Sequence, residues 1–292
     1  MYLIKSDYIS KIQVVNLAQV IQNNDEILTK CELIAQEECI GHLIQKYNTD
    51  KEFTDTRVWN IDTVYSAWDR VYLDAPAHTN AETYYIDDLV LYNGVVYKCN
   101  TNGTTGVFSA SAFDEIGAQY TIYYVKYPAP LFDYKKYYKV NDVVFWGDRT
   151  YTCIKETRIL THTDELQYSN YENIPLLNIF PDDPINGASQ WTPAELAYEL
   201  PAGTPLTDSA WAKSDNRNQL MLSTMVNVVL FYAHQSIAPR NIPQRIIDNY
   251  TKAVETLVGA SKGEFTFRLP LLQPKQGSRI RFGGNIKNEN SY

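Results

Sequence analysis

Histidine, cysteine and methionine are scarce in this chain of 292 residues, which contains four histidines, four cysteines and three methionines. The cysteines form no C-x-x-C pair and have no histidine at metal-ligand spacing. This pattern predicts free thiols in a reducing compartment rather than a zinc site or a disulfide framework. We therefore expect neither a metal nor another cofactor.

Sequence motifs of catalysis are also missing. The chain has no G-x-S-x-G elbow, and "GASKGEF" (259–265) lacks the G-x-x-x-x-G-K-S/T spacing of a phosphate-binding loop. Adjacent acids such as Asp87 and Asp88 would point to opposite sides of a strand and could not work as an acid/base pair. His42 and His234 are predicted on helices as packed or surface residues, with only Glu38 near His42. The sequence does not predict an enzyme.

Long apolar runs are absent too. The most apolar stretch, "MLSTMVNVVLFYA" (221–233), is too short to cross a bilayer and contains Asn227. The N-terminus has no apolar segment followed by a small-residue cleavage site, so neither a membrane span nor secretion is predicted.

Charge is distributed unevenly along the chain, whose net charge is −8. Lys and Arg against Asp and Glu count 6 to 9 in residues 1–60, 10 to 20 in 61–213 and 10 to 5 in 214–292. The acidic middle argues against a general nucleic-acid coat. The basic end fits either an acidic partner surface or a solvated tail.

Residues 1–60 are predicted to be helical. Ser6 is placed to cap a helix that runs to about Ile21, and Asn24 to cap a second helix with Asp25 and Glu26 in its first turn. The second helix is expected to pack through a stripe at helical spacing. This predicted stripe consists of Ile27, Cys31, Ile34, Ile40, Ile44 and Tyr47, with Cys39 also facing packing neighbours.

Residues 61–213 have the composition of strands and turns, with 17 of the 23 tyrosines and four of the five tryptophans. Within them, "DLVLYNGVVYKC" (88–99) is repeated as "DVVFWGDRTYTC" (142–153) at an offset of 54 residues. Alternating residues, a tight turn and a Tyr-x-Cys return strand predict a β-hairpin in each copy. We therefore expect two small β modules, at about 80–130 and 131–213.

Residues 214–270 return to helix. The segment 216–237 is apolar around most of its circumference and should be buried on several sides. Pro239 is expected to end it, Asn241 to cap the next helix, and Pro243 to fit the first turn of that helix. Gly259 or Gly263 should end the second helix, and "EFTFRLP" (264–270) is predicted to be a strand.

The predicted fold class is α+β. The most economical architecture is a discontinuous helical-bundle domain formed by residues 1–60 and 214–270, because neither part alone buries much core. The all-β region 61–213, with its two repeated modules, would be inserted between the two parts. Residues 271–292 would form an extended C-terminal arm.

Residues 236–270 resemble the end of phage Mu-type head–tail connector proteins, the adaptor or head-completion family of tailed phages. In that family a helix ends in an I-x-P-x-x-I-P corner, and a Y-x-x-A helix, a glycine and a closing L-P follow. The matching positions here are Ile237, Pro239, Ile242, Pro243, Tyr250, Ala253, Leu257, Gly263, Leu269 and Pro270. The start "YLIKSDY" and the later "LIQKYN" and "EFT" are also similar to that family, so the resemblance covers about 1–60 and 214–292.

This resemblance implies a structural virion protein of the head–tail neck, present in the host cytoplasm during assembly. It implies a ring, typically of twelve copies, that binds the portal protein and downstream tail or neck proteins. Double-stranded DNA would only pass through the channel, and no membrane would be involved. We expect Ile237, Pro239, Ile242 and Pro243 at the helix corner to contact partners. A further list of expected partner-binding residues in the arm is Arg279, Ile280, Arg281 and Phe282.

The middle region departs from the compact members of that family. It looks like small chitin- or polysaccharide-binding modules with a G-D-x-V-x-Y/W-x-G-x-x-Y-x-C pattern, although Asp87 and Asn141 stand where the glycine is expected. Tyr97 and Tyr151 are expected in the module cores, and Tyr92 and Trp146 are candidates for glycan contact. The alternative function is therefore a carbohydrate-binding structural protein of the tail or virion surface.

Overall fold

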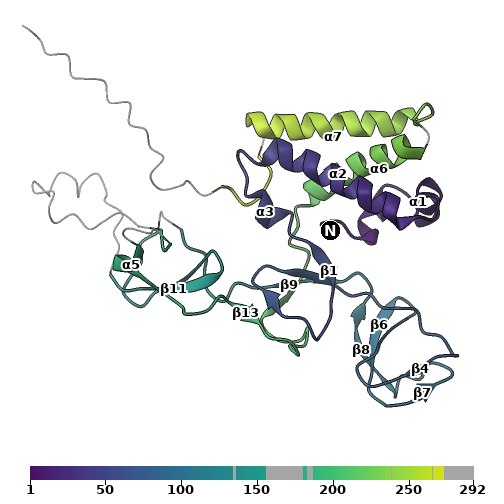
Figure 1. The fold of residues 1–292 in the computed structure, drawn as a ribbon, viewed down its shortest axis with the longest axis horizontal. Coiled ribbons are helices and arrows are strands. Elements are labelled where there is room, and N and C mark those ends of the chain that lie inside the picture. The colour runs from purple at the N-terminus through teal and green to yellow at the C-terminus, as the bar shows by residue number, and fades with distance from the viewer. Residues whose placement is uncertain (134–135, 156–179, 183–186, 238, 265, 273–292) are drawn as a thin grey trace, which may run out of the picture. The chain divides into compact units, whose positions relative to one another are not determined.

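The structure, a computed structural model, describes residues 1–133, 136–155, 180–182, 187–237, 239–264 and 266–272, and its fold belongs to the mixed α+β class (Figure 1). The chain divides into two compact units. The first comprises Met1–Pro128 and Ala197–Leu272, and the described part of the second lies within Ala129–Leu196.

Helices from both ends of the chain form what we call the helical body, within the first unit. Its elements are a 3-10 helix (Lys5–Ser10), α1 (Val14–Val20), α2 (Asp25–Leu43), α3 (Thr49–Glu52), α6 (Gln219–Ile237) and α7 (Gln244–Lys262). Figure 1 shows α2, α6 and α7 side by side. One hydrophobic core joins them, and it includes Cys31, Cys39 and Leu43 of α2, Met221, Met225 and Val229 of α6, and Ala253 and Leu257 of α7.

Helix α2 begins as predicted and packs through part of the predicted stripe. The Asn24 side chain accepts a hydrogen bond from the Glu26 N–H (2.9 Å), and Cys31, Cys39 and Tyr47 are buried, with Ile27 and Ile40 packed partly buried against the same core. The prediction is wrong for Ile34 and Ile44, which are half exposed. The buried positions within α2 are Leu28, Cys31, Glu32, Ala35, Cys39 and Leu43, which follow the i, i+3, i+4 spacing.

Two further expectations about the helical body are wrong. The predicted helix from Ser6 to Ile21 is instead the 3-10 helix and α1, separated by Gln13 in an extended conformation. The segment 264–270 forms no ladder among its described residues. Phe267 and Leu269 are buried in the helical core, and the Phe267 N–H donates to the Tyr47 hydroxyl (3.1 Å). Alternation alone predicted a strand, but in the described part of the chain no strand pairs with 264–270, and the nearest bridge is the isolated one between Tyr47 and Leu271.

The corner between α6 and α7 is close to the prediction. Helix α6 ends at Ile237, and Gly263 ends α7 in the left-handed conformation (φ 82°), where glycine has no Cβ penalty. The predicted Asn241 cap is wrong, since Pro243 itself occupies the N-cap position. The extended backbone of Pro243 lets its carbonyl accept from the Ile246 and Ile247 N–H groups.

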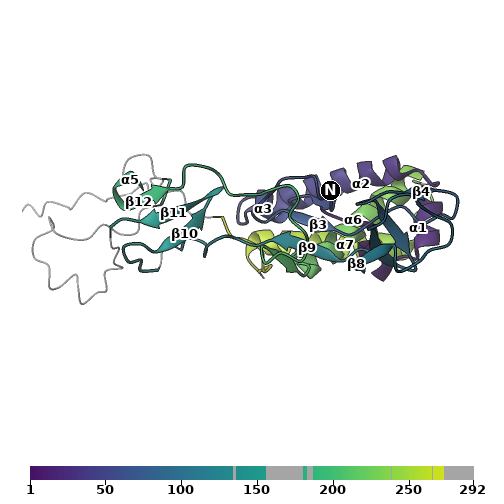
Figure 2. The same cartoon turned by 90° about the horizontal axis from the view of Figure 1, so that it is seen from below.

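The strands belong to three small modules. Module 1 contains β1 (Thr56–Val58), β2 (Tyr65–Ser66), β3 (Arg70–Tyr72), β9 (Ile122–Val125), β13 (Glu199–Leu200) and β14 (Trp211–Lys213). Module 2 contains β4 (Thr83–Tyr84), β5 (Leu89–Tyr92), β6 (Val95–Cys99), β7 (Thr104–Thr105) and β8 (Phe113–Ala118). Module 3, in the second unit, contains β10 (Val143–Trp146), β11 (Arg149–Cys153), α5 (Gly187–Gln190) and β12 (Trp191–Pro193) (Figure 2).

Both predicted hairpins are present. Strands β5 and β6 pair antiparallel with Tyr92 opposite Val95, and β10 and β11 pair with Trp146 opposite Arg149. A third strand then lies against each return strand, which gives the orders β5-β6-β8 and β10-β11-β12. Cys99 and Cys153 are fully buried at the end of the return strands, as free thiols.

Module 1 repeats the same framework, which the sequence analysis did not detect. In each module a buried tyrosine hydroxyl accepts from the backbone N–H five residues earlier, at 2.9 Å for Tyr65, 2.8 Å for Tyr84 and 2.8 Å for Tyr138. Four residues after each tyrosine, an aspartate accepts from the N–H three residues before it. A buried aromatic residue, Trp211, Phe113 or Trp191, then lies opposite Val125, Cys99 or Cys153.

Module 1 is interrupted twice in the sequence. Its strands β3 and β9 pair directly, with Val71 opposite Tyr123, although all of module 2 lies between them along the chain. Module 3 lies between β9 and β13 in the sequence. The sheet of module 1 therefore has the order β1-β3-β9-β14.

Candidate functional site

Module 2 carries an exposed stack of aromatic rings. The Tyr92 and Phe108 rings are parallel, with centroids 4.1 Å apart, and Phe108 stacks in turn on buried Phe113 at 5.0 Å. His78 meets the edges of both Tyr92 and Phe108. The Tyr92 side chain is 37% exposed. Because Phe108 covers one ring face, Tyr92 offers the rest of its ring to a flat apolar partner.

Module 3 has a comparable but more covered cluster. Trp146 occupies the framework position of Tyr92, and its ring lies 5.6 Å from Phe132 and 5.2 Å from Phe180. Phe132 packs on buried Trp191 at 5.5 Å. Trp146 is only half-buried, so part of its ring is accessible. Of the two tyrosines expected in the cores, Tyr151 is buried, whereas Tyr97 is half-buried against Phe108.

Module 1 has no aromatic ring at this framework position. Leu73 stands at the position of Tyr92 and Trp146, and it is buried in a core that includes Val96 of module 2. A Cβ on Gly117 of module 2 would meet the Leu73 Cδ1 at 3.0 Å, which shows how closely the Leu73 side chain approaches the Gly117 backbone. At this position module 1 therefore packs against module 2 and does not face solvent.

The predicted helix corner lies on the surface of the helical body. Pro239 and Pro243 are exposed, while Ile237 and Ile242 are half-buried. Ile237 and His234 line a hollow of about 270 Å³ beside α1, and burial lowers the pKa of His234. The structure thus places these corner residues together.

Behind the corner, two tyrosines fix α6 and α7 to α2. Tyr232 and Tyr250 donate to the Glu38 carboxylate at 2.8 and 3.0 Å, and Tyr250 also stacks on Phe231 at 4.0 Å. Burial first, and then the contact with Glu38, raises the pKa of Tyr232. The corner therefore lies at the end of a helix pair that is fixed to α2.

The outer side of α2 and its C-cap combines apolar and charged side chains. Leu33 and Ile34 of α2 and Ile44 of the C-cap are 49, 50 and 51% exposed, and the exposed Lys30 and Glu37 lie with them on the side away from the buried stripe. Gly41 lies within the same face, and a Cβ added there would meet no atom within 4 Å. Large apolar side chains that gather on one exposed face mark a contact surface.

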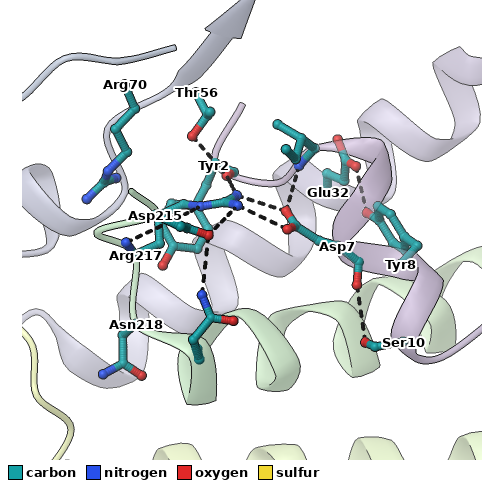
Figure 3. Close-up of polar contacts among 12 residues, drawn as sticks. Tyr2, Asp7, Tyr8, Ser10, Glu32, Thr56, Arg70, Asp215, Arg217 and Asn218 are labelled. Carbon is teal, nitrogen blue, oxygen red and sulfur yellow. Dashed lines mark hydrogen bonds and ion pairs between the residues drawn. The ribbon is translucent and has the colours of Figure 1, made fainter. Parts of the chain in front are cut away.

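A buried network of charges joins the helical body to module 1 (Figure 3). Arg217 is fully buried, and its guanidinium pairs with Asp7 at 2.8 Å and Asp215 at 2.9 Å and donates to the Tyr2 carbonyl. Burial alone would lower the pKa of Arg217, but hydrogen bonds to Asp215 and the charge of Asp7 raise it overall. This arginine is held permanently charged and is not suited to proton transfer.

Arg70 forms the second half of this network. It is completely buried on β3, and it donates to the Glu52 carbonyl (2.6 Å) and the Thr54 carbonyl (3.2 Å) at the end of α3 and to the Asn216 side chain (2.7 Å). Burial lowers the pKa of Arg70, and the Glu52 carboxylate opposes that effect. Nearby, the Lys51 ammonium lies 4.9 Å from the Trp68 ring centroid and 4.7 Å from that of Tyr127.

The predicted site residues thus fall into separate places. The corner residues lie on the helical body, Tyr92 in module 2 and Trp146 in module 3, whereas Arg279, Ile280, Arg281 and Phe282 lie outside the described residues. The sequence analysis missed Arg70 and Arg217. A pattern Y-x-x-x-D-x-V at Tyr65, Tyr84 and Tyr138 was the signal that could have revealed module 1 and so placed Arg70 on its strand.

Within the described residues, no cluster of three or more His, Cys, Asp or Glu side chains is arranged to hold a metal ion. Helix α6, longer than the apolar run considered in the sequence, is long and apolar enough to cross a membrane, and half of its apolar window is buried inside the helical body. The core helix of a soluble protein has the same properties.

Comparison with models of known protein families gives no match, and no curated protein is similar to the chain.

Proposed function

We propose that this chain is a head-to-tail adaptor subunit, a structural virion protein that forms a ring between portal and tail and continues the DNA channel. The observation that carries the proposal is the outer side of α2 and its C-cap, where Leu33, Ile34 and Ile44 are exposed away from the core. A neighbouring copy that packs there would bury these side chains, as ring subunits do through heterologous contacts.

The helix corner supports the same proposal. Ile237, Pro239, Ile242 and Pro243, on which the family resemblance depends, lie together at one end of the α6–α7 pair. In this proposal residues 1–60 and 214–270 act as one discontinuous helical adaptor domain. The region 61–213 is its β insertion, and the acidic character of that region suits a position outside a channel that carries DNA.

Mass photometry of the purified chain, alone and with the portal protein of the same genome, tests the proposal. We expect a stoichiometric ring of this chain on the portal. Ile34→Glu should strongly reduce the bound copies, because it buries a charge in the subunit contact. Val107→Glu is the matched control, since Val107 is an exposed apolar residue of module 2. If the wild-type chain does not bind the portal, the proposal fails.

A second candidate function is glycan binding, and the exposed stack of Tyr92 on Phe108 favours it. Aromatic faces bind the C–H faces of flat apolar groups such as sugar rings. Retention on a polysaccharide resin that is lost on Tyr92→Ala or Trp146→Ala would support it. Tyr85→Ala is the control, because Tyr85 is 58% exposed and lies outside the ring cluster. Retention that neither Tyr92→Ala nor Trp146→Ala changes would refute it.

A further inference from the structure

A hollow lies between modules 1 and 2, and the charge network, the ring clusters and the helix corner contribute no residue to it. Its volume is about 510 Å³, and its walls come from 58–62 in module 1 and from 86–89 and 98 in module 2. Because Leu73, Val96 and the sheet of module 1 share one core, both walls belong to one compact unit.

The hollow has an excess of negative charge. Asp62, Asp87 and Asp88 line it together with one cation, Lys98, which pairs with Asp87 at 3.1 Å. Asp88 accepts from the Tyr85 N–H, whereas no ion pair within the described part of the chain uses the Asp62 carboxylate. Two half-exposed apolar side chains, Val58 and Ile86, also form part of its wall.

A buried donor also belongs to this wall. Trp59 lines the hollow and is 4% exposed, and its indole Nε1 finds no hydrogen-bond partner among the residues that the structure describes. An indole N–H can only donate, and a buried donor without a partner costs about 1–3 kcal/mol. This N–H is closed to solvent in the free chain, so an acceptor reaches it only if the wall rearranges.

We propose that this hollow binds the basic C-terminal arm, residues 273–292, of a second copy of this chain. The arm carries four Lys or Arg residues and one Glu, and Arg279, Ile280, Arg281 and Phe282 alternate cations with apolar side chains. In an extended peptide such alternation presents charge to one side and apolar groups to the other. The carboxylates and the apolar wall match both sides.

The length of the arm is sufficient for an exchange between copies. The described chain ends at Leu272, whose N–H donates to the Lys46 carbonyl (3.1 Å) in the helical body. The 20 residues beyond it span up to about 65 Å when extended. The choice of a second copy as the source of the arm rests on the proposed ring, in which neighbours are held at a fixed distance and the exchange gains effective concentration.

Binding of a fluorescein-labelled peptide of residues 273–292 to the full chain tests this inference without a ring. The full chain carries R279E and R281E, so that its own arm does not compete. We expect saturable binding that weakens at least tenfold on D62N with D87N, and weakens with added salt. Glu255→Gln on α7 is the matched control, because it removes an exposed carboxylate elsewhere.

A second measurement reports on the hollow directly. On addition of unlabelled peptide, the indole N–H resonance of Trp59 should shift because Trp59 lines the hollow, while that of Trp191 in module 3 should not. Absence of saturable binding, or binding that D62N with D87N leaves unchanged, overturns the inference. If the peptide does not bind but the chain forms a normal ring on the portal, only the arm site is refuted. If the peptide binds but no ring forms, only the adaptor function is refuted.

Discussion

The helical body and module 1 differ from modules 2 and 3 in where they keep their charges. Among the described residues, the buried charged side chains are Glu32, Glu52, Arg70 and Arg217, and all of them belong to the helical body, to module 1 or to the segment between the two. In modules 2 and 3 the ion pairs of Lys98 and Arg149 are at least partly exposed, and aromatic rings fill the cores.

The difference shows how one framework serves two purposes. At the position where module 1 has buried Arg70, module 2 has half-buried Leu89 and module 3 has Val143, which is 44% exposed. At the position of Leu73, the other modules have partly accessible rings. Module 1 uses both positions to attach its neighbours, whereas Tyr92, Val143 and Trp146 at these positions of modules 2 and 3 are partly exposed.

Removing a buried charge should have the largest effect. Arg217→Met leaves Asp7 and Asp215 without their cation, and we expect a loss of about 3–5 kcal/mol in the free energy of unfolding. Urea denaturation followed by circular dichroism measures this loss. The matched variant Arg149→Met in module 3 removes a side chain from an exposed pair and should leave the unfolding midpoint unchanged. Equal effects of the two variants would contradict the comparison.

The second prediction concerns pH. Burial raises the pKa of Glu32 to about 7, although its hydrogen bond with Tyr8 (2.6 Å) opposes the shift. The folded state therefore favours the protonated acid. The stability from this group is fully present below the unfolded pKa of about 4.3 and is lost as pH rises through about 7.

Between pH 5 and pH 8 this loss should amount to roughly 2–3 kcal/mol. Glu32→Gln should remove most of that slope, and Glu255→Gln should retain it. Urea unfolding at the two pH values measures the slope. A Glu32→Gln chain whose stability changes between pH 5 and pH 8 as much as that of the wild type would exclude this role for Glu32.

An exchange of side chains between modules tests the third difference. Leu73→Tyr should cost about 1–3 kcal/mol, because a ring at this position has no room beside Gly117. The reverse change, Tyr92→Leu, alters an accessible position and should stay within about 0.5 kcal/mol. Thermal unfolding compares the two variants. A Leu73→Tyr chain as stable as the wild type would show that module 2 is not held there.

The smallest predicted effect is one that the three modules should share. Tyr65→Phe, Tyr84→Phe and Tyr138→Phe each remove a hydroxyl that accepts from a backbone N–H. We expect each change to cost about 1 kcal/mol. Denaturant titration of each variant tests this. If only one of the three variants loses stability, the modules share the geometry of this hydrogen bond but not its contribution to stability.

Local signals predicted much of this fold correctly. The Asn24 cap, the end of α6 before Pro239, the Gly263 stop and both hairpins depend on residues close in sequence. The face of α2 could not be chosen this way, because its apolar residues lie on opposite sides of the helix. Burial of one side depends on α6 and α7, which come almost 200 residues later.

The buried charge network between the helical body and module 1, and module 1 itself, could not be predicted from the sequence for a similar reason. Arg70 and Arg217 look like surface residues in the sequence, and their partners lie at Glu52, Asn216 and Asp7. Module 1 has no hairpin turn to recognise, since module 2 stands in its place. Among the candidate site residues, Tyr92 could be placed at the end of its strand because its own hairpin is complete.

The position of module 2 within module 1 has a consequence for the order of folding. Strands β3 and β9 can pair only when Leu73 and Thr121 meet, and these residues are joined by a 3.0 Å hydrogen bond in the folded chain. A disordered loop of residues 74–120 would make that encounter costly, by about 2–3 kcal/mol relative to a tight turn. Module 2 contains a local hairpin, so we expect it to fold first and to bring β3 and β9 together. A chain with 74–120 replaced by Asn-Gly should therefore close its module 1 sheet sooner than the native chain does.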